Sequence, residues 1–142
     1  MTFLHLAKQF SISPQKIEQT LNSTTSWETR YRALMLLGKA LPAFPEHAKR
    51  DENRVLGCES NVWLYAYLED DKYYFAIGSD AKIVKGLIAI LLSKINGQSQ
   101  KDIIEFDLQQ YLTDLKIFGQ LSSSRTNGLN AIRNRVVDYL SN

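Results

Sequence analysis

The chain has 142 residues, 44% of them hydrophobic and 23% charged, and these values are typical of one globular domain of ordinary size. The formal net charge is +2, with lysines and arginines interspersed among nearly as many carboxylates. A concentrated basic stripe, the usual mark of a nucleic-acid-binding protein, is missing, so we exclude that class. We expect residues 1–142 to form a single domain.

The N-terminal residues lack the features of a secretory signal. His5 and Lys8 interrupt the apolar positions, and Pro14 follows soon after. The longest wholly apolar run, residues 87–92, is far shorter than the roughly 20 residues that a membrane-spanning helix requires. We therefore expect a cytoplasmic protein without a membrane partner.

Two helices are predicted in the first third of the chain. The first covers residues 14–21, with Ser13 as its cap. The second begins at a capping box of Thr25 and Glu28 and is ended by Pro42. Its apolar side chains recur at helical intervals at Tyr31, Leu34, Leu37 and Leu41. The polar, proline-containing stretch that follows is predicted to be a loop.

Two strands are predicted in the middle of the chain. Residues 62–68 and 73–77 are rich in aromatic and β-branched side chains, which are typical of strands. The polar residues 69–72 between them have the length of a hairpin connection, so the strands should pair antiparallel. Val55 and its neighbours are expected to add a third strand.

Three helices are predicted after the strands. The first is capped by Ser79 or Asp80 and closed by Gly97, the second begins at Ser99, and the third ends the chain. Their inward residues are expected to be Ile83, Val84, Leu87, Ile88, Leu91 and Ile95, then Ile104, Leu108, Tyr111, Leu112 and Leu115, then Leu129, Ile132, Val136 and Leu140. This order of elements favours an α+β fold, in which helices cover one face of a small antiparallel sheet of about three strands.

The single cysteine, Cys58, is the main candidate functional residue. One cysteine excludes an internal disulfide and a multi-cysteine zinc site, which leaves an inert core residue, a reactive thiol or an intermolecular bridge. Free cysteine is often buried in a core. Gly57 directly before it permits a tight turn that would project the thiol outward from the start of the predicted strand at Val62. The residue pattern alone leaves the inert and the reactive alternatives open.

Four motifs follow one another along the chain. They are RYR, LGK and LPxxP within residues 30–45, ENRVxGCxSxVWL at residues 52–64, GSDAxIVxGL at residues 78–87 and LSxSRxxGL at residues 121–129. From about Trp27 to the C-terminus, these ordered motifs resemble those of the SufE and CsdE proteins, a family that accepts sulfur from cysteine desulfurases. Glu59 is similar to the CsdE branch and Ser60 to the SufE branch, so both branches stay open.

The resemblance implies a SufE/IscU-like sandwich and a place in a sulfur relay. A partner cysteine desulfurase of the SufS or CsdA type would use pyridoxal phosphate to strip sulfur from free cysteine, so this chain would need no cofactor of its own. Cys58, as a thiolate, would accept the persulfide sulfur. It would then pass the sulfur to an iron-sulfur scaffold such as SufBCD or to another acceptor, and the desulfurase would be stimulated.

Asp80 and Arg125 lie in motifs that match the family near the cysteine, and we take them as candidate supporting residues. Each has a simpler alternative, because Asp80 is also placed to cap a helix and Arg125 to bond the end of a neighbouring element. Trp63 is expected to pack in the core, because alternation along the strand accounts for it.

The sequence around Cys58 contains no evident activating group. Glu59 disfavours ionisation of the thiol, and Arg54 helps only if the fold brings it close. We therefore hypothesise that apolar residues such as Val55 and Trp63 shelter the thiol in the free protein. Docking on the desulfurase would then expose it, which limits oxidation between transfers.

Two functions of other classes compete with a sulfur carrier. A cysteine hydrolase needs a histidine base beside Cys58, and the candidates are His5 and His47, which are predicted to lie on the surface outside any metal-ligand spacing. A regulatory module that acts by contact alone would leave the cysteine incidental. Replacing Cys58 with serine distinguishes the second alternative from a carrier.

Overall fold

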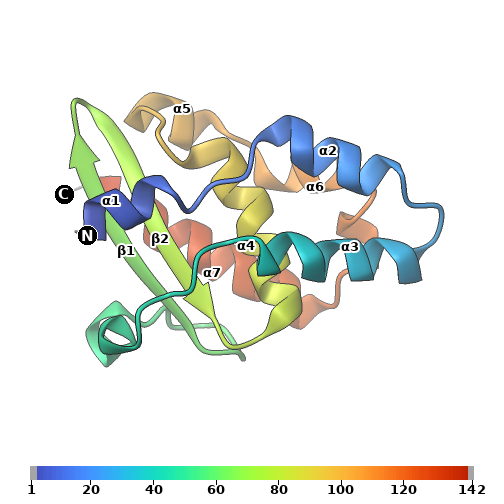
Figure 1. Cartoon of the computed structure of the whole chain (residues 1–142), viewed down its shortest axis with the longest axis horizontal. Helices are drawn as coiled ribbons and strands as arrows, with labels where there is room; N and C mark the ends of the chain where they lie inside the picture. Colours follow the sequence, from blue (N-terminus) through green and yellow to red (C-terminus); the bar gives the residue numbers. More distant parts are fainter. Residues whose placement is uncertain (1–2, 141–142) are drawn as a thin grey trace.

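The computed structural model describes residues 3–140, and it places most of them in seven α-helices and one β-hairpin (Figure 1). No helix in this part of the chain has both the length and the apolar character needed to cross a membrane. The helices are α1 Phe3–Lys8, α2 Pro14–Asn22, α3 Trp27–Lys39, α4 Lys82–Ile95, α5 Gln100–Glu105, α6 Leu108–Asp114 and α7 Ser123–Leu140, the strands are β1 Val62–Glu69 and β2 Lys72–Ser79, and short 3-10 turns cover Glu46–Ala48, Asp51–Asn53 and Phe118–Gln120.

The two predicted strands and the connection between them are confirmed. β1 and β2 pair antiparallel, residue for residue, over their whole length. Asp70 and Asp71 form the turn with φ angles of 52° and 63°. Two left-handed residues in succession match the twist of the flanking strands, which is why such turns close hairpins.

The expected third strand is wrong, although the α+β class is confirmed. Arg54 forms an isolated antiparallel bridge with Trp63, and the Val55 amide donates one hydrogen bond to β1 at 2.8 Å. The 3-10 turn Asp51–Asn53 lies directly before this stretch, and Gly57 turns the chain directly after it with φ 94°. The extended segment between them is too short to pair as a strand.

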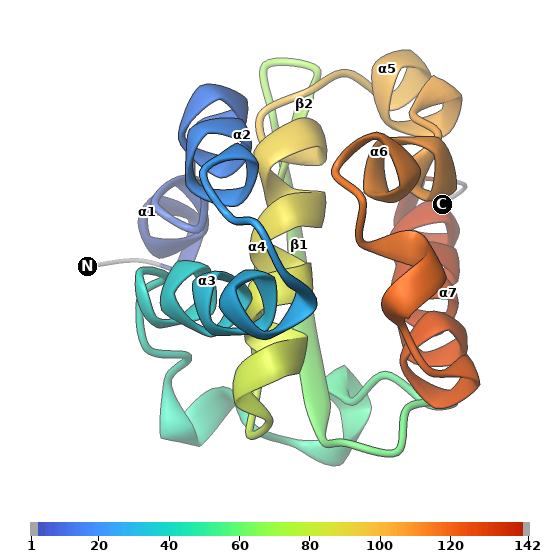
Figure 2. The ribbon, with the colours of Figure 1, turned by 90° about the vertical axis from the view of Figure 1, so that its right-hand side faces the viewer.

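Helix α4 lies at the centre of the core, with the hairpin behind it and the other helices around it (Figure 2). It packs against β2 and also contacts α2, α3, α5 and α7. Ten of its residues are buried, including all predicted inward positions except the half-buried Val84. The predicted cap at Ser79 or Asp80 is wrong, because Ser79 ends β2 and the N-cap position is Ala81, whose amide donates to the Ser79 hydroxyl at 3.2 Å.

Helices α3 and α4 cross closely because each has a glycine at the crossing. A Cβ atom at Gly86 would lie 2.1 Å from the Leu34 carbonyl oxygen, and one at Gly38 would lie 2.5 Å from the Gly86 amide nitrogen. Backbone atoms at these distances leave no room for a side chain. The crossing also brings outward side chains of the two helices onto one surface.

The capping box of α3 lies one residue later than predicted. The Ser26 hydroxyl accepts from the Thr29 amide at 3.2 Å, and the Thr29 hydroxyl accepts from the Ser26 amide at 3.2 Å. Ser26 has the extended backbone that a cap requires, so it takes the place predicted for Thr25. Glu28 instead forms an ion pair with Arg32 one turn along the helix.

The single helix predicted from Ser99 is two helices, α5 and α6. Asp107 starts α6 by accepting a hydrogen bond from the Gln110 amide at 3.0 Å. The break changes the helical phase, so Ile103 is 3% exposed whereas Ile104, which was predicted to face inward, is 47% exposed. Leu108, Leu112 and Leu115 in and after α6 and the four predicted positions of α7 are buried as expected, and Tyr111 is half-buried.

The short helix α1 was not predicted, because its few residues carry too little periodicity. It packs against the hairpin, mainly on β2. The Asn96 side-chain amide donates to the carbonyls of Ala7 and Phe10, both at 2.9 Å, and its oxygen accepts from the Phe75 amide at 2.8 Å. One side chain after α4 thus ties the N-terminal segment to the sheet.

Candidate functional site

Cys58 lies in the loop that leads into β1 and is half-buried. Gly57 has φ 94°, a conformation that residues with side chains rarely adopt. A Cβ atom at Gly57 would lie 3.2 Å from the Ala131 Cβ, so the loop passes close to α7. The glycine makes the predicted tight turn, but the turn directs the thiol toward a helix and not outward.

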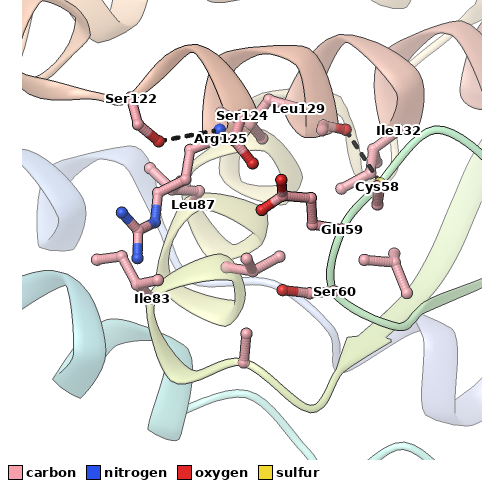
Figure 3. A pocket seen from close by; sticks show the side chains of 14 residues that line it. Cys58, Glu59, Ser60, Ile83, Leu87, Ser122, Ser124, Arg125, Leu129 and Ile132 are labelled. Atoms are coloured by element: carbon pink, nitrogen blue, oxygen red, sulfur yellow. Dashed lines mark hydrogen bonds between the residues drawn. The ribbon is translucent and has the colours of Figure 1, made fainter.

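Cys58 lines a pocket of about 190 Å³ between its own loop, the start of α4 and the first half of α7 (Figure 3). The lining combines the thiol with the carboxylate of Glu59, the guanidinium of Arg125, three serines and several aliphatic side chains. The lining residues are Cys58, Glu59, Ser60, Val62, Ala81, Ile83, Val84, Leu87, Ser122, Ser124, Arg125, Gly128, Leu129 and Ile132.

The thiol is held against α7 in its protonated form. The sulfur donates a hydrogen bond to the Gly128 carbonyl at 3.4 Å (Figure 3), and a Cβ atom at Gly128 would be 3.8 Å from the sulfur. Burial raises the pKa of the Cys58 thiol, because a less polar surrounding disfavours the thiolate. The thiolate is the nucleophile, so the free protein keeps the sulfur in its less reactive state.

The thiol is sheltered by α7 at Gly128, which was not among the residues expected to shelter it, Val55 and Trp63. These two side chains are 3% and 8% exposed, but neither lines the pocket. Trp63 stacks on Phe44 with ring centroids 6.4 Å apart, which confirms it as a core residue. Arg54 also lies outside the pocket lining, so it does not supply a charge there.

Arg125 lies in the same pocket as Cys58, as the motif resemblance implies. Its guanidinium carbon is 5.9 Å from the ring centroid of Tyr31 on α3, and the side chain points away from the sulfur (Figure 3). The backbone amide of Arg125 donates to the Ser122 hydroxyl at 3.3 Å, at the start of α7. In this arrangement Arg125 closes the end of the pocket toward α3 and does not pair with the thiol.

Asp80 does not line the pocket, although Ala81 beside it does. Its carboxylate accepts a hydrogen bond from the Asn61 side-chain amide at 3.0 Å and lies 3.9 Å from the Lys49 ammonium. Asn61 precedes β1 and Asp80 follows β2, so this bond ties together the two open ends of the hairpin. The structure therefore places Asp80 beside the Cys58 loop, as a residue that fixes where the loop ends.

Neither of the two histidines in the chain lines the pocket. His5 and His47 are exposed, as predicted, and the His47 ring contacts Phe3 with centroids 5.3 Å apart. The pocket thus lacks the imidazole base of a cysteine hydrolase. Among residues 3–140, no three His, Cys, Asp or Glu side chains are grouped so that they could hold a metal ion.

The cover that α7 places over the thiol was not predicted. The contacting helix follows the cysteine by some 70 residues, and periodicity says nothing about such distant contacts. One signal was available in Gly128, which lies inside an amphipathic helix. Glycine costs about 1 kcal/mol there relative to alanine, which marks the position, although a Cβ atom there would make only an ordinary contact with the sulfur at 3.8 Å.

The fold and the pocket define a small α+β protein with one sheltered thiol. Comparison of its sequence with known proteins identifies the family. A family model described as "SufE: Fe-S metabolism associated domain" matches residues 15–140. The sulfur acceptor protein CsdE of Escherichia coli K12 is 34% identical over 128 residues, which are 89% of this chain and 87% of that protein. The cysteine desulfuration protein SufE of Wigglesworthia glossinidia brevipalpis is 33% identical over 115 residues, 80% of each chain. This chain belongs to the SufE family.

The architecture also matches a solved structure, the solution structure of a hypothetical protein from Thermus thermophilus. The TM-score is 0.68, and the match covers 92% of this chain and 96% of the other at 20% sequence identity. At this identity the likeness concerns the fold alone, and it supports the α+β class.

Proposed function

We propose that this protein is a sulfur acceptor that takes persulfide sulfur from a cysteine desulfurase onto Cys58 and passes it toward iron-sulfur cluster assembly. The desulfurase is of the SufS or CsdA type and carries the pyridoxal phosphate, so this chain uses no cofactor of its own. The next acceptor is a scaffold such as SufBCD or another sulfur-accepting protein. Membership of the SufE family and two relatives named for sulfur acceptance and cysteine desulfuration support the proposal.

The observation that carries the proposal is the position of the only cysteine. Cys58 lies in a short loop at the edge of the molecule, at a pocket whose lining includes no histidine. A nucleophilic sulfur with no base beside it suits an exchange at sulfur, in which the leaving group is a thiolate that needs no proton to depart. It does not suit hydrolysis, which must also activate water.

The transfer step is an exchange at sulfur. The Cys58 thiolate attacks the outer sulfur of the desulfurase persulfide, and a new sulfur-sulfur bond forms on Cys58. The bond inside the partner persulfide breaks, and the partner cysteine leaves as a thiolate. The electron count balances without an added oxidant or reductant.

The pKa of the Cys58 thiol, raised by burial, makes docking part of this mechanism. The hydrogen bond from sulfur to the Gly128 carbonyl has to break before the sulfur can leave the pocket. Once the loop moves away from α7, the sulfur is solvated again and its pKa falls toward the ordinary value of a thiol. Docking then both brings the Cys58 sulfur out of the pocket and favours its thiolate form.

Intact mass spectrometry tests the proposal directly. The protein is incubated with a desulfurase of either type and free cysteine, and its mass is read with and without reductant. We expect a gain of one sulfur that reductant removes and that maps to the peptide containing Cys58. A mass that stays unchanged while the desulfurase turns over contradicts the proposal.

Sheltering of the thiol predicts slow alkylation in the free protein. At neutral pH, iodoacetamide should modify Cys58 about tenfold or more slowly than a peptide of the same local sequence, because less thiolate is present and the pocket restricts access. The pH midpoint of the rate should lie above that of the peptide, since burial raises the thiol pKa. Protein unfolded in urea is the control and should react at the rate of the peptide. A folded protein that reacts as fast as the peptide refutes the shelter.

Replacing His47 with alanine should leave sulfur transfer unchanged, because the imidazole is exposed and lies outside the pocket. The measurement is the rate at which the protein gains sulfur from the desulfurase, compared with the unaltered chain. A large loss of transfer with the fold intact would favour a general-base role and the hydrolase alternative.

A further inference from the structure

A groove between α3 and α4 lies outside the cysteine pocket. It has a volume of about 450 Å³, and its lining combines two apolar side chains with four cationic ones. We call this surface the basic groove. Its lining residues are Arg32, Met35, Leu36 and Lys39 of α3 and Lys82 and Lys85 of α4.

The basic groove includes an apolar side chain, Leu36, that the fold leaves exposed. Leu36 is 65% exposed, whereas Leu34 and Leu37 beside it on α3 are 0% and 3% exposed. Met35 is half-buried, and its flexible side chain adapts to different partners. Leucine in a concave surface gains free energy when another apolar side chain covers it.

Three of the four cations of the basic groove have no carboxylate partner within residues 3–140. Arg32 is paired with Glu28, but within residues 3–140 no carboxylate lies within ion-pair distance of Lys39, Lys82 or Lys85. The two lysines of α4 occupy its first turn, which holds no acidic residue and no side-chain cap. Cations are disfavoured at that end of a helix, where the backbone already carries partial positive charge. Carboxylates from another molecule would offset the repulsion between these lysines and the positive end of the helix.

The basic groove and the cysteine pocket meet at the first turn of α4. Ala81, Ile83 and Val84 line the pocket, while Lys82 and Lys85 line the groove. The start of α4, in yellow-green, lies between α3 on one side and α7 on the other (Figure 2). A protein that docks over Cys58 is therefore brought next to the groove.

We propose that the basic groove binds an acidic segment of the desulfurase that loads Cys58, with an apolar side chain of that segment seated on Met35 and Leu36. Its carboxylates face Lys39, Lys82 and Lys85. This inference rests on the proposed function. A protein segment fits better than nucleic acid or a lipid surface, because the lining holds apolar as well as cationic side chains and the whole chain has a formal net charge of only +2.

A double variant, Leu36→Ala with Lys82→Glu, tests the docking site. Ile104→Ala with Lys101→Glu is the matched control, because it also removes one exposed apolar side chain and reverses one exposed first-turn lysine, on α5 away from the groove. The groove variant should raise the Kd for the desulfurase about tenfold or more and weaken its salt dependence. The control should change the Kd by no more than about twofold. At saturating desulfurase, Cys58 should still gain sulfur in both variants.

Several results overturn the inference. A groove variant that binds as tightly as the control, or a control that loses as much affinity as the groove variant, shows that the groove is not the contact. The unaltered chain could instead bind phosphatidylglycerol vesicles or duplex DNA more tightly than it binds the desulfurase. If the groove variant loses that binding, the surface belongs to another ligand. If the unaltered chain gains sulfur normally, these outcomes contradict only the proposed docking site and leave the proposed function standing. If it gains none, the proposed function fails as well.

Discussion

Replacing Cys58 with serine is expected to abolish sulfur acceptance and the stimulation of the desulfurase together. A hydroxyl does not ionise near neutral pH and cannot carry a persulfide, and the chain has no second cysteine to take over. After incubation with desulfurase and cysteine, the mass of the variant should stay unchanged. Cysteine turnover should remain at the level of the desulfurase alone.

The fold of this variant should be intact, which makes the result interpretable. Serine is slightly smaller than cysteine, and its hydroxyl can donate to the same Gly128 carbonyl that now accepts from the sulfur. Circular dichroism and the affinity for the desulfurase serve as controls, and both should be close to those of the unaltered chain. A variant that still stimulates the desulfurase would identify a regulator that acts by contact alone.

Replacing Gly86 with alanine should lower the free energy of unfolding by about 3 kcal/mol, near the upper end of overpacking effects. Alanine favours a helix over glycine by only about 1 kcal/mol. The added Cβ atom would meet the Leu34 carbonyl oxygen at 2.1 Å, and because the obstacle is backbone, no side-chain rotation relieves it. The steric term therefore outweighs the helix propensity. Urea unfolding followed by circular dichroism measures the change.

Gly128→Ala is the matched control for this prediction, because it makes the same change inside another helix. Its Cβ atom would lie 3.8 Å from the Cys58 sulfur, an ordinary contact distance. We expect a gain in stability of about 0.5–1 kcal/mol from the helix propensity. Equal effects of the two substitutions would show that the crossing of α3 and α4 is looser than the structure has it.

Elements whose signal lies in local periodicity could be predicted from the sequence. The hairpin followed from alternating aromatic and β-branched residues, and the buried face of α7 followed from Leu129, Ile132, Val136 and Leu140. Predictions failed where neighbouring residues can play the same part. Thr25 and Ser26 both can cap a helix, and only the backbone conformation decides between them. The break before α6 was missed because periodicity carried across Asp107, a residue that starts a new helix.

The candidate site could be predicted only in its centre. Cys58 was singled out because it is the only cysteine and follows a glycine, but only the resemblance to the family favoured a reactive thiol. Arg125 was found because it belongs to a motif that resembles the family. The sequence does not say that Asp80 bonds to Asn61 outside the pocket, nor that α7 covers the sulfur. These two features depend on contacts between segments that are far apart in the sequence, and the periodicity of neighbouring residues carries no information about such contacts.

The bond between Asn61 and Asp80 limits how the thiol can travel. With the Val55 amide bonded to β1 on one side and Asn61 tied to Asp80 on the other, the freely moving part is confined to residues 56–60. A loop of this length loses little entropy when it returns to α7, and it closes again within about 10–100 ns. Under the proposed function, the time during which the Cys58 sulfur is exposed is then set by how long the partner stays bound, and the motion of the loop adds almost nothing to it.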